Sequence, residues 1–190
     1  AGVELAGAEV PEEEGDAAKN ESSFEPEPGG HQYAIDLLKQ VTNLNAGIYL
    51  EEDLKNSSKT KFCIGVAGYP EKHFEAPNME SDLKHLKTKV DAGADYIVTQ
   101  MFFDNSKYFN FVNACREIGI MVPIIPGLKP VYSKKQLTIL PKTFHIDLPT
   151  PLSEAISNCK TDLDVERVGT EWLLHQSKEL KAAGVPVLHY

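Results

Sequence analysis

The feature that most constrains this chain is a regular alternation of strand-like and helix-like segments from residue 31 onward. Runs rich in apolar residues predict buried strands. Apolar residues that recur every three or four positions predict helices, as Leu83, Leu86 and Val90 do. Short connections between the two types are typical of parallel βαβ units. We therefore predict strands at residues 61–67, 95–102, 121–125 and 185–190, and helices at 34–44, 78–92, 105–118, 133–140, 152–159 and 163–183.

Capping residues mark the ends of two of these helices. Asn78 and Asn105 are expected to cap the helices that follow them, because a side-chain oxygen at this position accepts a hydrogen bond from a free amide of the first turn. Gly93 and Gly119 are expected to end the same helices, since glycine adopts the left-handed conformation at little cost.

The alternation predicts an α/β fold of the (β/α)8 TIM-barrel class, with only the second half of the barrel in this chain. A complete barrel needs about 250 residues, and four strands are predicted after residue 60 of 190. An open four-stranded sheet is the alternative, but its parallel edges and one of its faces would need cover. The start on Ala1 without methionine and the end inside a predicted strand also indicate a piece of a longer protein.

The net charge of −9 is concentrated at the N-terminus. Residues 1–30 carry −8, from nine acidic side chains and Lys19, which leaves −1 for residues 31–190. We expect residues 1–30 to form an acidic disordered segment and residues 31–190 to form the partial barrel. The nearly neutral folded part lacks the basic face that nucleic-acid binding requires. No apolar run reaches the roughly 18 residues that cross a bilayer, so no membrane partner is expected and a cytoplasmic location is the default.

The cysteines Cys63, Cys115 and Cys159 lie far apart in predicted strands or helices among apolar neighbours. This arrangement favours buried free thiols over a disulfide framework. The six histidines show no metal-ligand spacing. No metal site is expected.

A rigid corner follows the first predicted strand. Gly68, Tyr69 and Pro70 lead out of it, and His73 follows among charged residues. In α/β barrels the loops at the carboxyl ends of the strands build the active site. A rigid surface loop with solvated charges accounts for the corner about equally well.

Two further features near the strand ends are candidates for ligand binding. Asp82, His85 and Lys89 share one stripe of a predicted helix. An exposed acid/base face is favoured by geometry alone, but the stripe also suits a ligand with phosphates and hydroxyls. Gln100 lies near the end of the strand 95–102 on the face of Tyr96. If that face lines the barrel, its amide needs a hydrogen-bond partner from a bound heterocycle, from backbone or from water.

Several motifs of the chain, in order, resemble those of the methylenetetrahydrofolate reductases over about residues 15–190. They are V-A-G-Y-P-E-x-H (66–73), D-L-x-x-L-K-x-K-V-D-A-G-A-D (82–95), T-Q-M-F-F-D (99–104) and P-I-I-P-G (123–127). The resemblance implies a (β/α)8 flavoprotein that binds FAD, takes its reducing equivalents from NADH or NADPH, and converts 5,10-methylenetetrahydrofolate to 5-methyltetrahydrofolate. This reaction belongs to the one-carbon metabolism that supplies methionine.

The resemblance also implies roles for individual residues. Gln100 and Gln136 match folate-binding glutamines, Gln100 also lies where the nicotinamide stacks on the flavin, and Leu140 matches a position that packs against the exchanging substrates. His85 and Thr88 stand where some members carry asparagine and arginine. The positions that match FAD contacts are Tyr33, Ala34, Tyr69, His73, Asp82, His85 and Lys89.

Residues 14–16 read Glu-Gly-Asp where the family has Arg-Gly-Asp. Gly15 and Asp16 therefore match cofactor positions, and Asp16 is the candidate catalytic residue. The residues before them lack the apolar strand expected there.

The family's first strands are absent from the chain, and with them the glutamate proposed as general acid toward the folate. We therefore expect the chain alone to be inactive. The alternative is a non-catalytic piece that retains part of the FAD site, as a homo-oligomer or with a partner that supplies the missing half. An aldolase-type barrel is disfavoured because no predicted strand carries an internal lysine that could form a Schiff base.

Overall fold

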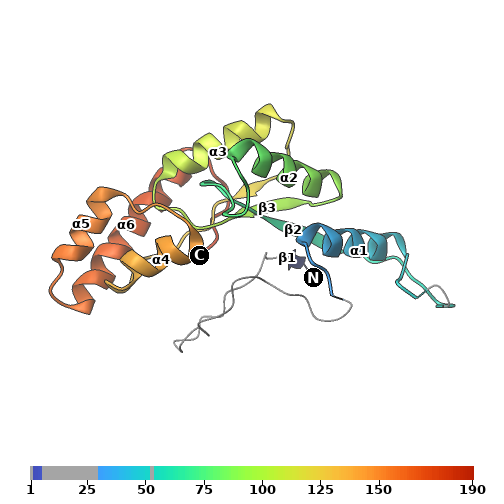
Figure 1. The fold of residues 1–190 in the computed structure, drawn as a ribbon, viewed down its shortest axis with the longest axis horizontal. Helices are drawn as coiled ribbons and strands as arrows, with labels where there is room; N and C mark the ends of the chain where they lie inside the picture. Colours follow the sequence, from blue (N-terminus) through green and yellow to red (C-terminus); the bar gives the residue numbers. More distant parts are fainter. Residues whose placement is uncertain (1, 6–29, 52–53) are drawn as a thin grey trace.

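The computed structural model describes residues 2–5, 30–51 and 54–190 and has four parallel strands in one sheet. The strands follow each other across the sheet in chain order, and the helices between them return the chain for each parallel pairing (Figure 1). The predicted α/β class with a parallel sheet is confirmed, whereas the barrel and its division into halves stay predictions. The elements are β1 (Gly2–Leu5), α1 (Ala34–Ala46), β2 (Cys63–Gly68), α2 (Met79–Asp91), β3 (Tyr96–Thr99), α3 (Asn105–Glu117), β4 (Ile124–Ile125), α4 (Gln136–Phe144), α5 (Thr150–Asn158) and α6 (Asp162–Ala182).

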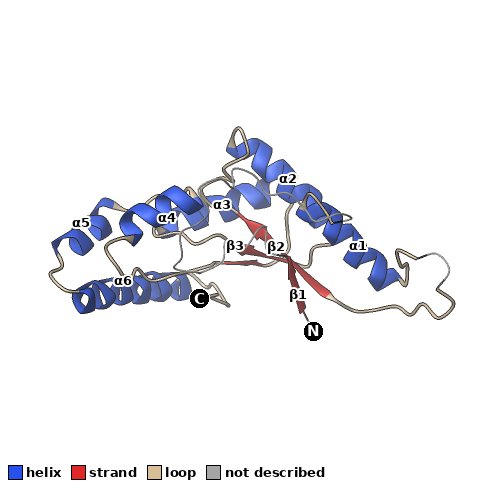
Figure 2. Cartoon of the chain, turned by 60° about the horizontal axis from the view of Figure 1, so that its bottom comes forward, coloured by secondary structure: helices blue, strands red, loops and turns tan. Residues whose placement is uncertain are grey.

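One apolar core joins the sheet to the first three helices, which lie on one side of the strands (Figure 2). Ile64 and Val66 of β2 and Ile97 of β3 are buried in it. Burial of such side chains is the main force that holds amphipathic helices on a sheet. Their partners on the helices include Leu38, Val41, Leu83, Leu86, Phe111 and Cys115.

The opposite face of the sheet is less covered. In β3 the buried residues Ile97 and Thr99 alternate with Tyr96 and Val98, which are half-buried. The Tyr96 ring lies over Gly65 of β2, where a β-carbon would overlap it. The Tyr96 ring therefore packs across the neighbouring strand on this face, to which alternation assigns Gln100 as well.

A second apolar cluster holds α4, α5 and α6 together at the other end of the molecule (Figure 1). Leu140, Leu152, Ile156 and Val165 are buried in it. Hydrogen bonds tie this end to the segment after β3. Trp172 donates its Nε1–H to the carbonyl of Phe103 (3.0 Å), and the Gln176 side-chain amide donates to the carbonyl of Phe102 (3.3 Å) and to Asn105 Oδ1 (3.2 Å).

The strands differ from the sequence predictions at both ends of the chain. The prediction that no strand precedes residues 14–16 was wrong, because Gly2–Leu5 pairs with Cys63–Val66 as β1. Only two of these four residues are apolar, too few for an apolar run. The predicted strand at 185–190 is reduced to one parallel bridge between Gly127 and His189. Pro186 cannot donate to a ladder, which explains the shortening.

Two helix starts also differ. Asp104, not Asn105, caps α3, and its Oδ1 accepts from Ser106 N at 2.9 Å. Asn105 instead is buried and donates to the Gln176 carbonyl at 3.1 Å. The helix predicted at 133–140 is shifted toward the C-terminus, to Gln136–Phe144. The cap at Asn78 is confirmed, with Oδ1 accepting from Ser81 N at 2.8 Å.

The thiols are only partly as predicted. All three cysteines are free, and Cys115 is buried. Cys63 is exposed and Cys159 half-buried, so the prediction of burial was wrong for Cys63, the first residue of β2. The first residue of a strand lies at the end of the sheet, where its side chain can be exposed to solvent even when its neighbours in the sequence are apolar.

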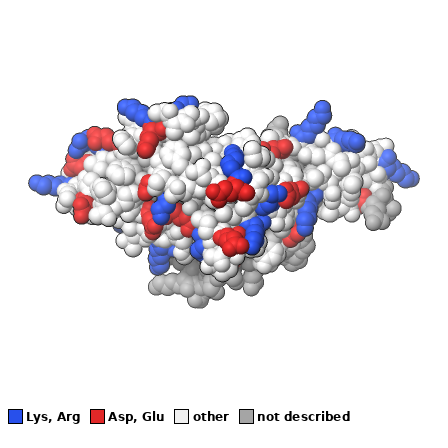
Figure 3. All heavy atoms as spheres, turned by 90° about the horizontal axis from the view of Figure 1, so that it is seen from above, with Lys and Arg blue, Asp and Glu red and all other residues white. Residues whose placement is uncertain are grey.

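Acidic and basic side chains are interspersed over the face seen in Figure 3. Among the described helices, none is long and apolar enough to cross a membrane.

Candidate functional site

The corner after β2 begins at a glycine that no larger residue could replace without strain. A β-carbon on Gly68 would lie 2.8 Å from Ile97 Cγ2 and 2.9 Å from Phe111 Cζ. The strand end therefore packs against its neighbours with no side chain of its own, and Tyr69 and Pro70 leave the sheet at a fixed place. Tyr69 accepts a backbone hydrogen bond from Lys72 N (3.1 Å), which closes the turn.

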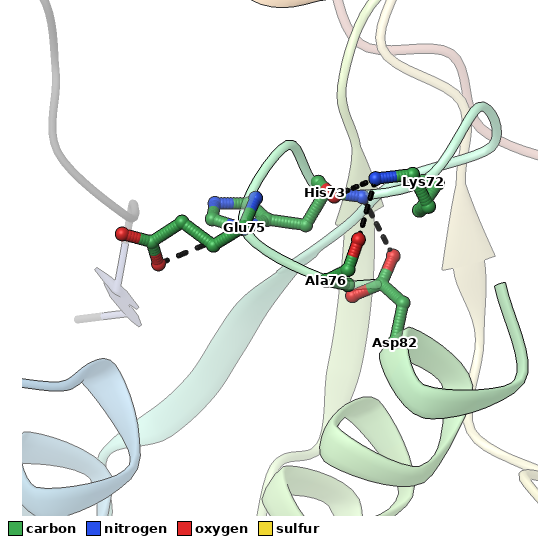
Figure 4. Close-up of polar contacts among 5 residues, drawn as sticks. All are labelled: Lys72, His73, Glu75, Ala76 and Asp82. Atoms are coloured by element: carbon green, nitrogen blue, oxygen red, sulfur yellow. Dashed lines mark hydrogen bonds and ion pairs between the residues drawn. The ribbon is translucent and has the colours of Figure 1, made fainter. Parts of the chain in front are cut away.

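The corner is braced from within by Lys72 (Figure 4). Lys72 has a positive φ of 81°, a conformation that lysine rarely adopts. Its Nζ donates to the carbonyl oxygens of His73 (2.9 Å) and Ala76 (2.6 Å), and Ala76 N donates to the same His73 carbonyl at 3.1 Å. A cation that satisfies two carbonyls offsets the strained backbone beside it.

Asp82 of α2 fastens this loop to the helix. Its Oδ2 accepts from the backbone N–H of His73 at 2.9 Å, and the residue is 9% exposed (Figure 4). The loop can thus move only if this bond to the first turn of α2 breaks.

Two half-buried rings, those of Tyr69 and His73, form one wall of the corner. The centroids of Tyr69 and His73 lie 4.6 Å apart, edge to face. The pKa of Tyr69 is raised, chiefly by burial and further by the charges of Asp82 and Glu75. The pKa of His73 is lowered, chiefly by burial, so the imidazole is predominantly neutral at neutral pH. The wall therefore presents a phenol and a neutral imidazole.

The polar stripe of α2 divides in the structure. Asp82 is buried and Lys89 half-buried, and Lys89 Nζ donates to the carbonyl of Ala67 at 2.9 Å, at the end of β2. Burial lowers the pKa of Lys89, against the opposing charge of Asp82. His85 is exposed. The alternative of a wholly exposed acid/base face was therefore wrong for two of the three residues, which lie at the carboxyl edge of the sheet.

Gln100 lies beside the corner. Its backbone N–H donates to the carbonyl of Gly68 (2.8 Å), and its Oε1 accepts from Met101 N (3.0 Å). The backbone thus provides one partner for the amide, as the alternative reading of this residue expected. A small pocket runs beside it, lined by Tyr69, Pro70, Glu71, Lys72, Gln100, Met101, Phe144, His145 and Ile146.

Other predicted site residues lie apart from the corner or outside the described residues. Gln136 Oε1 accepts from Tyr132 N (2.6 Å) and Ser133 N (3.3 Å), so this side chain stabilises the turn before α4. Leu140 is buried in the cluster of α4, α5 and α6. Tyr33 is exposed as the N-cap of α1, and Ala34 begins that helix. Gly15 and Asp16 fall outside the described residues.

Glu71 is a site residue that sequence reasoning missed. Its side chain is 8% exposed, it lines the pocket beside Gln100, and its pKa is raised by burial. Periodicity gives no information on a loop residue, and the only signal in the sequence was its place directly after Pro70. Among the described residues, no group of three or more His, Cys, Asp or Glu side chains could hold a metal ion.

Comparison with known proteins gives a consistent result. The family described as "Methylenetetrahydrofolate reductase" matches residues 13–190. The chain is 35% identical over 173 residues to "Methylenetetrahydrofolate reductase 2" of Saccharomyces cerevisiae, covering 90% of this chain and 27% of that protein. It is 35% identical over 185 residues to "Methylenetetrahydrofolate reductase (NADH) 1" of Arabidopsis thaliana, covering 92% and 29%. It is 38% identical over 130 residues to "Probable methylenetetrahydrofolate reductase (NADPH)" of Caenorhabditis elegans, covering 67% and 20%.

The chain thus spans less than a third of these relatives' own lengths. Among solved structures, a Clostridium thermocellum protein described as binding two copies of 5-methyl-5,6,7,8-tetrahydrofolic acid aligns with a TM-score of 0.48. The identity is 21%, over 67% of this chain and 46% of that one.

Proposed function

Because this chain belongs to the methylenetetrahydrofolate reductase family, we propose that it forms part of the site in which FAD-dependent reduction of 5,10-methylenetetrahydrofolate to 5-methyltetrahydrofolate takes place, with NADH or NADPH as reductant. The observation that carries the proposal is the convergence of Tyr69, His73, Asp82 and Lys89 at the carboxyl edge of a parallel sheet. This edge is where α/β folds bind their ligands.

The donor set at this edge fits a flavin dinucleotide. Lys89 brings a cation to the end of β2, and Tyr69 brings a hydroxyl and a ring face. Lys89 uses one donor on the Ala67 carbonyl, and an ammonium group has three. Lys89 would hold a phosphate oxygen, and Tyr69 and the neutral imidazole of His73 would pack against or hydrogen-bond the rest of the ligand. The flavin supplies the hydride chemistry when bound.

The chain's own residues have defined tasks in this proposal. Asp82 holds the His73 amide and so fixes the loop that carries both rings. Gln100 presents an amide beside the pocket, where it would orient the folate. Opening the methylene bridge of the folate requires protonation of a nitrogen, hence a general acid. Asp16 stays a candidate for a catalytic role, and we propose that residues 1–190 alone are inactive because the family's general-acid glutamate is not among them.

We also propose that the parallel sheet is half of a (β/α)8 barrel and that the protein is cytoplasmic. In support of the half-barrel, helices α1 to α3 lie on one side of the sheet, while alternate residues of β3 on the other side are only half-buried.

The FAD proposal is tested by titrating the purified chain with FAD and following the flavin absorption and fluorescence. Lys89→Met is expected to weaken binding at least ~10-fold, because a charge-assisted hydrogen bond contributes about 1.5–3 kcal/mol. Lys84→Met is the matched control, since Lys84 is exposed on the same helix and paired with Glu80. Equal loss in both variants, or absence of FAD binding in the chain and in a version extended to the relatives' length, would refute the proposed site.

A second candidate function follows from the half-buried sheet face at Tyr96 and Val98. It is a non-catalytic assembly role, in which the chain pairs with a copy of itself or with a partner that supplies further strands. Mass in solution together with an activity assay distinguishes the two. A monomer that reduces 5,10-methylenetetrahydrofolate with NADH or NADPH at a rate near that of a full-length relative would contradict both the assembly role and the proposed inactivity.

A further inference from the structure

The loop between α4 and α5 is joined to the corner after β2 by a carboxylate bridge. Asp147 donates its backbone N–H to Glu71 Oε2 at 3.0 Å. Lys107 of α3 lies between the two acids, with its Nζ 3.6 Å from Glu71 Oε2 and 3.2 Å from Asp147 Oδ2. Three segments that are far apart in sequence therefore meet at Glu71.

The burial of this group is uneven. The Glu71 side chain is 8% exposed, whereas those of Lys107 and Asp147 are 38% and 79% exposed. Burial raises the pKa of Glu71, although the Asp147 amide and the Lys107 cation favour the charged form. The desolvation cost of a buried carboxylate offsets much of what its ion pair adds to the free energy of unfolding, so such a pair does little to stabilise a fold. Its position therefore calls for a purpose other than holding the fold.

A second contact joins the same two loops. The rings of Phe74 and His145 are stacked, with centroids 5.2 Å apart and an angle of 21°. Phe74 in turn lies 4.7 Å from the His73 ring, which contacts Tyr69. His145 has a positive φ of 53°, so its ring is directed by a turn that a residue with a β-carbon seldom adopts. A continuous row of rings thus leads from the α4–α5 loop to Tyr69 and His73, the two rings proposed to contact the flavin.

We propose that Glu71 is a positioning residue for the ligand site, which fixes the corner carrying Tyr69 and His73 against the loop 145–149. The proposal rests on the proposed function in one respect, that the ligand is FAD. Glu71 lies two residues after Tyr69 and lines the same pocket as Gln100 and His145. When its bridge to Lys107 and Asp147 is intact, the pocket wall and the ring pair keep one relative position before the ligand arrives.

The bridge is tested by hydrogen exchange in wild type, Glu71→Ala, Glu71→Gln and Lys107→Met. The reporter is the backbone amide of His73, which is bonded to Asp82. Glu71→Ala is expected to speed its exchange at least ~10-fold, because the bridge that restrains local opening is lost. Glu71→Gln and Lys107→Met each keep an acceptor for the Asp147 amide but lose the ion pair. The His73 exchange rates of both variants should therefore lie between those of wild type and Glu71→Ala. Glu80→Gln, which removes an exposed charge on α2, is the control and should equal wild type.

Two readouts separate positioning from a purely structural role. Amides of α6 around the buried Leu180 should exchange alike in all variants, which shows that the fold persists. The difference in His73 protection between wild type and Glu71→Gln should vanish as the pH is lowered and Glu71 takes up a proton. The other titratable groups at this place, Lys72, Lys107, Asp147, His145 and Tyr69, are present in both proteins, so the difference reports Glu71 together with its direct coupling to Lys107 and Asp147.

FAD titration supplies the second arm, with an expected loss of affinity of about threefold in Glu71→Gln and about tenfold in Glu71→Ala. The positioning role would be overturned if the His73 amide exchanged at the same rate in Glu71→Ala as in wild type. It would also be overturned if the difference in His73 exchange rate between wild type and Glu71→Gln were the same at every pH. Absence of FAD binding in wild type would instead count against the proposed function, while the exchange experiment still decides the role of Glu71.

Discussion

The backbone amide of His73 and the carboxylate of Asp82 are joined by a hydrogen bond of 2.9 Å that fixes a loop to the first turn of α2. The bond has a buried acceptor, since Asp82 is 9% exposed. The same carboxylate is the opposing charge that partly offsets the desolvation of Lys89. One side chain therefore links the ring wall to the cation at the strand end, and its removal should affect both.

Asp82→Ala is expected to lower the free energy of unfolding by about 1–3 kcal/mol, because the part-buried amide of His73 loses its carboxylate acceptor. Denaturation in urea measures this change. Asp91→Ala, at the exposed end of the same helix, is the control and should stay within about 0.5 kcal/mol of wild type. Equal effects of the two substitutions would show that the His73 bond does not stabilise the loop.

Lys89 should give stability a specific pH dependence. Its pKa is lowered by burial in the folded state, so the unfolded chain binds the proton more tightly. Below the pKa that Lys89 has in the folded protein, the free-energy cost of burying the cation is fully present. This cost is relieved as the pH rises from that pKa toward 10.5, the ordinary pKa of lysine. The unfolding free energy of wild type should therefore rise relative to that of Lys89→Met over this alkaline range. A difference that is constant with pH would contradict the burial of Lys89.

The substitution Gly169→Ala sets two opposite effects on stability against each other, a gain in helix propensity and a steric clash. In an exposed helix the change would stabilise by about 1 kcal/mol. In α6, however, a β-carbon on Gly169 would overlap the carbonyl oxygen of Val131, a backbone atom that cannot turn aside. We expect a net loss of about 1–3 kcal/mol by thermal or urea unfolding. Thr170→Ala, on the exposed side of the same turn, should be neutral or slightly stabilising, and a stabilised Gly169→Ala would refute the close approach.

The thiols should differ in reactivity in the native protein. Cys63 is exposed, whereas burial raises the pKa of Cys115 to about 11. At pH 8 an alkylating reagent should modify Cys63 rapidly and Cys115 only on unfolding, because the thiolate is the reactive form. Mass spectrometry of peptides after timed labelling measures both. Labelling of Cys115 in step with Cys63 would contradict the buried site.

The sequence was most informative where a local rule was sufficient. Helix α2 was predicted with its cap at Asn78, because a capping side chain and an apolar stripe act within one helix. The cap of α3 was misplaced by one residue, since Asp104 and Asn105 are both good caps and the contact of Asn105 with α6 decides between them. Strand β1 was missed because its pairing with β2 depends on a partner some sixty positions away, as in Gly2 with Cys63.

The site shows the same division. The sequence places Tyr69 and His73 on one corner, and the structure brings their rings into contact because the turn between them is short. The inward positions of Asp82 and Lys89 could not be read from periodicity, which finds the faces of a helix but not the loop that covers one of them. Gln136 was expected near the ligand by resemblance, and the structure shows its Oε1 accepting from the amides of Tyr132 and Ser133, a local contact with no signature in the sequence pattern.

The order of the sheet has a consequence for how the polypeptide acquires its structure. Each strand pairs with the one made just before it, and the bridge of Gly127 to His189 extends this order beyond β4. During synthesis every new strand can therefore pair with a neighbour that is already in place, whereas Asn105 gains its partner only when α6 is made. Assembly can then proceed in step with the ribosome, from the amino end to the carboxyl end.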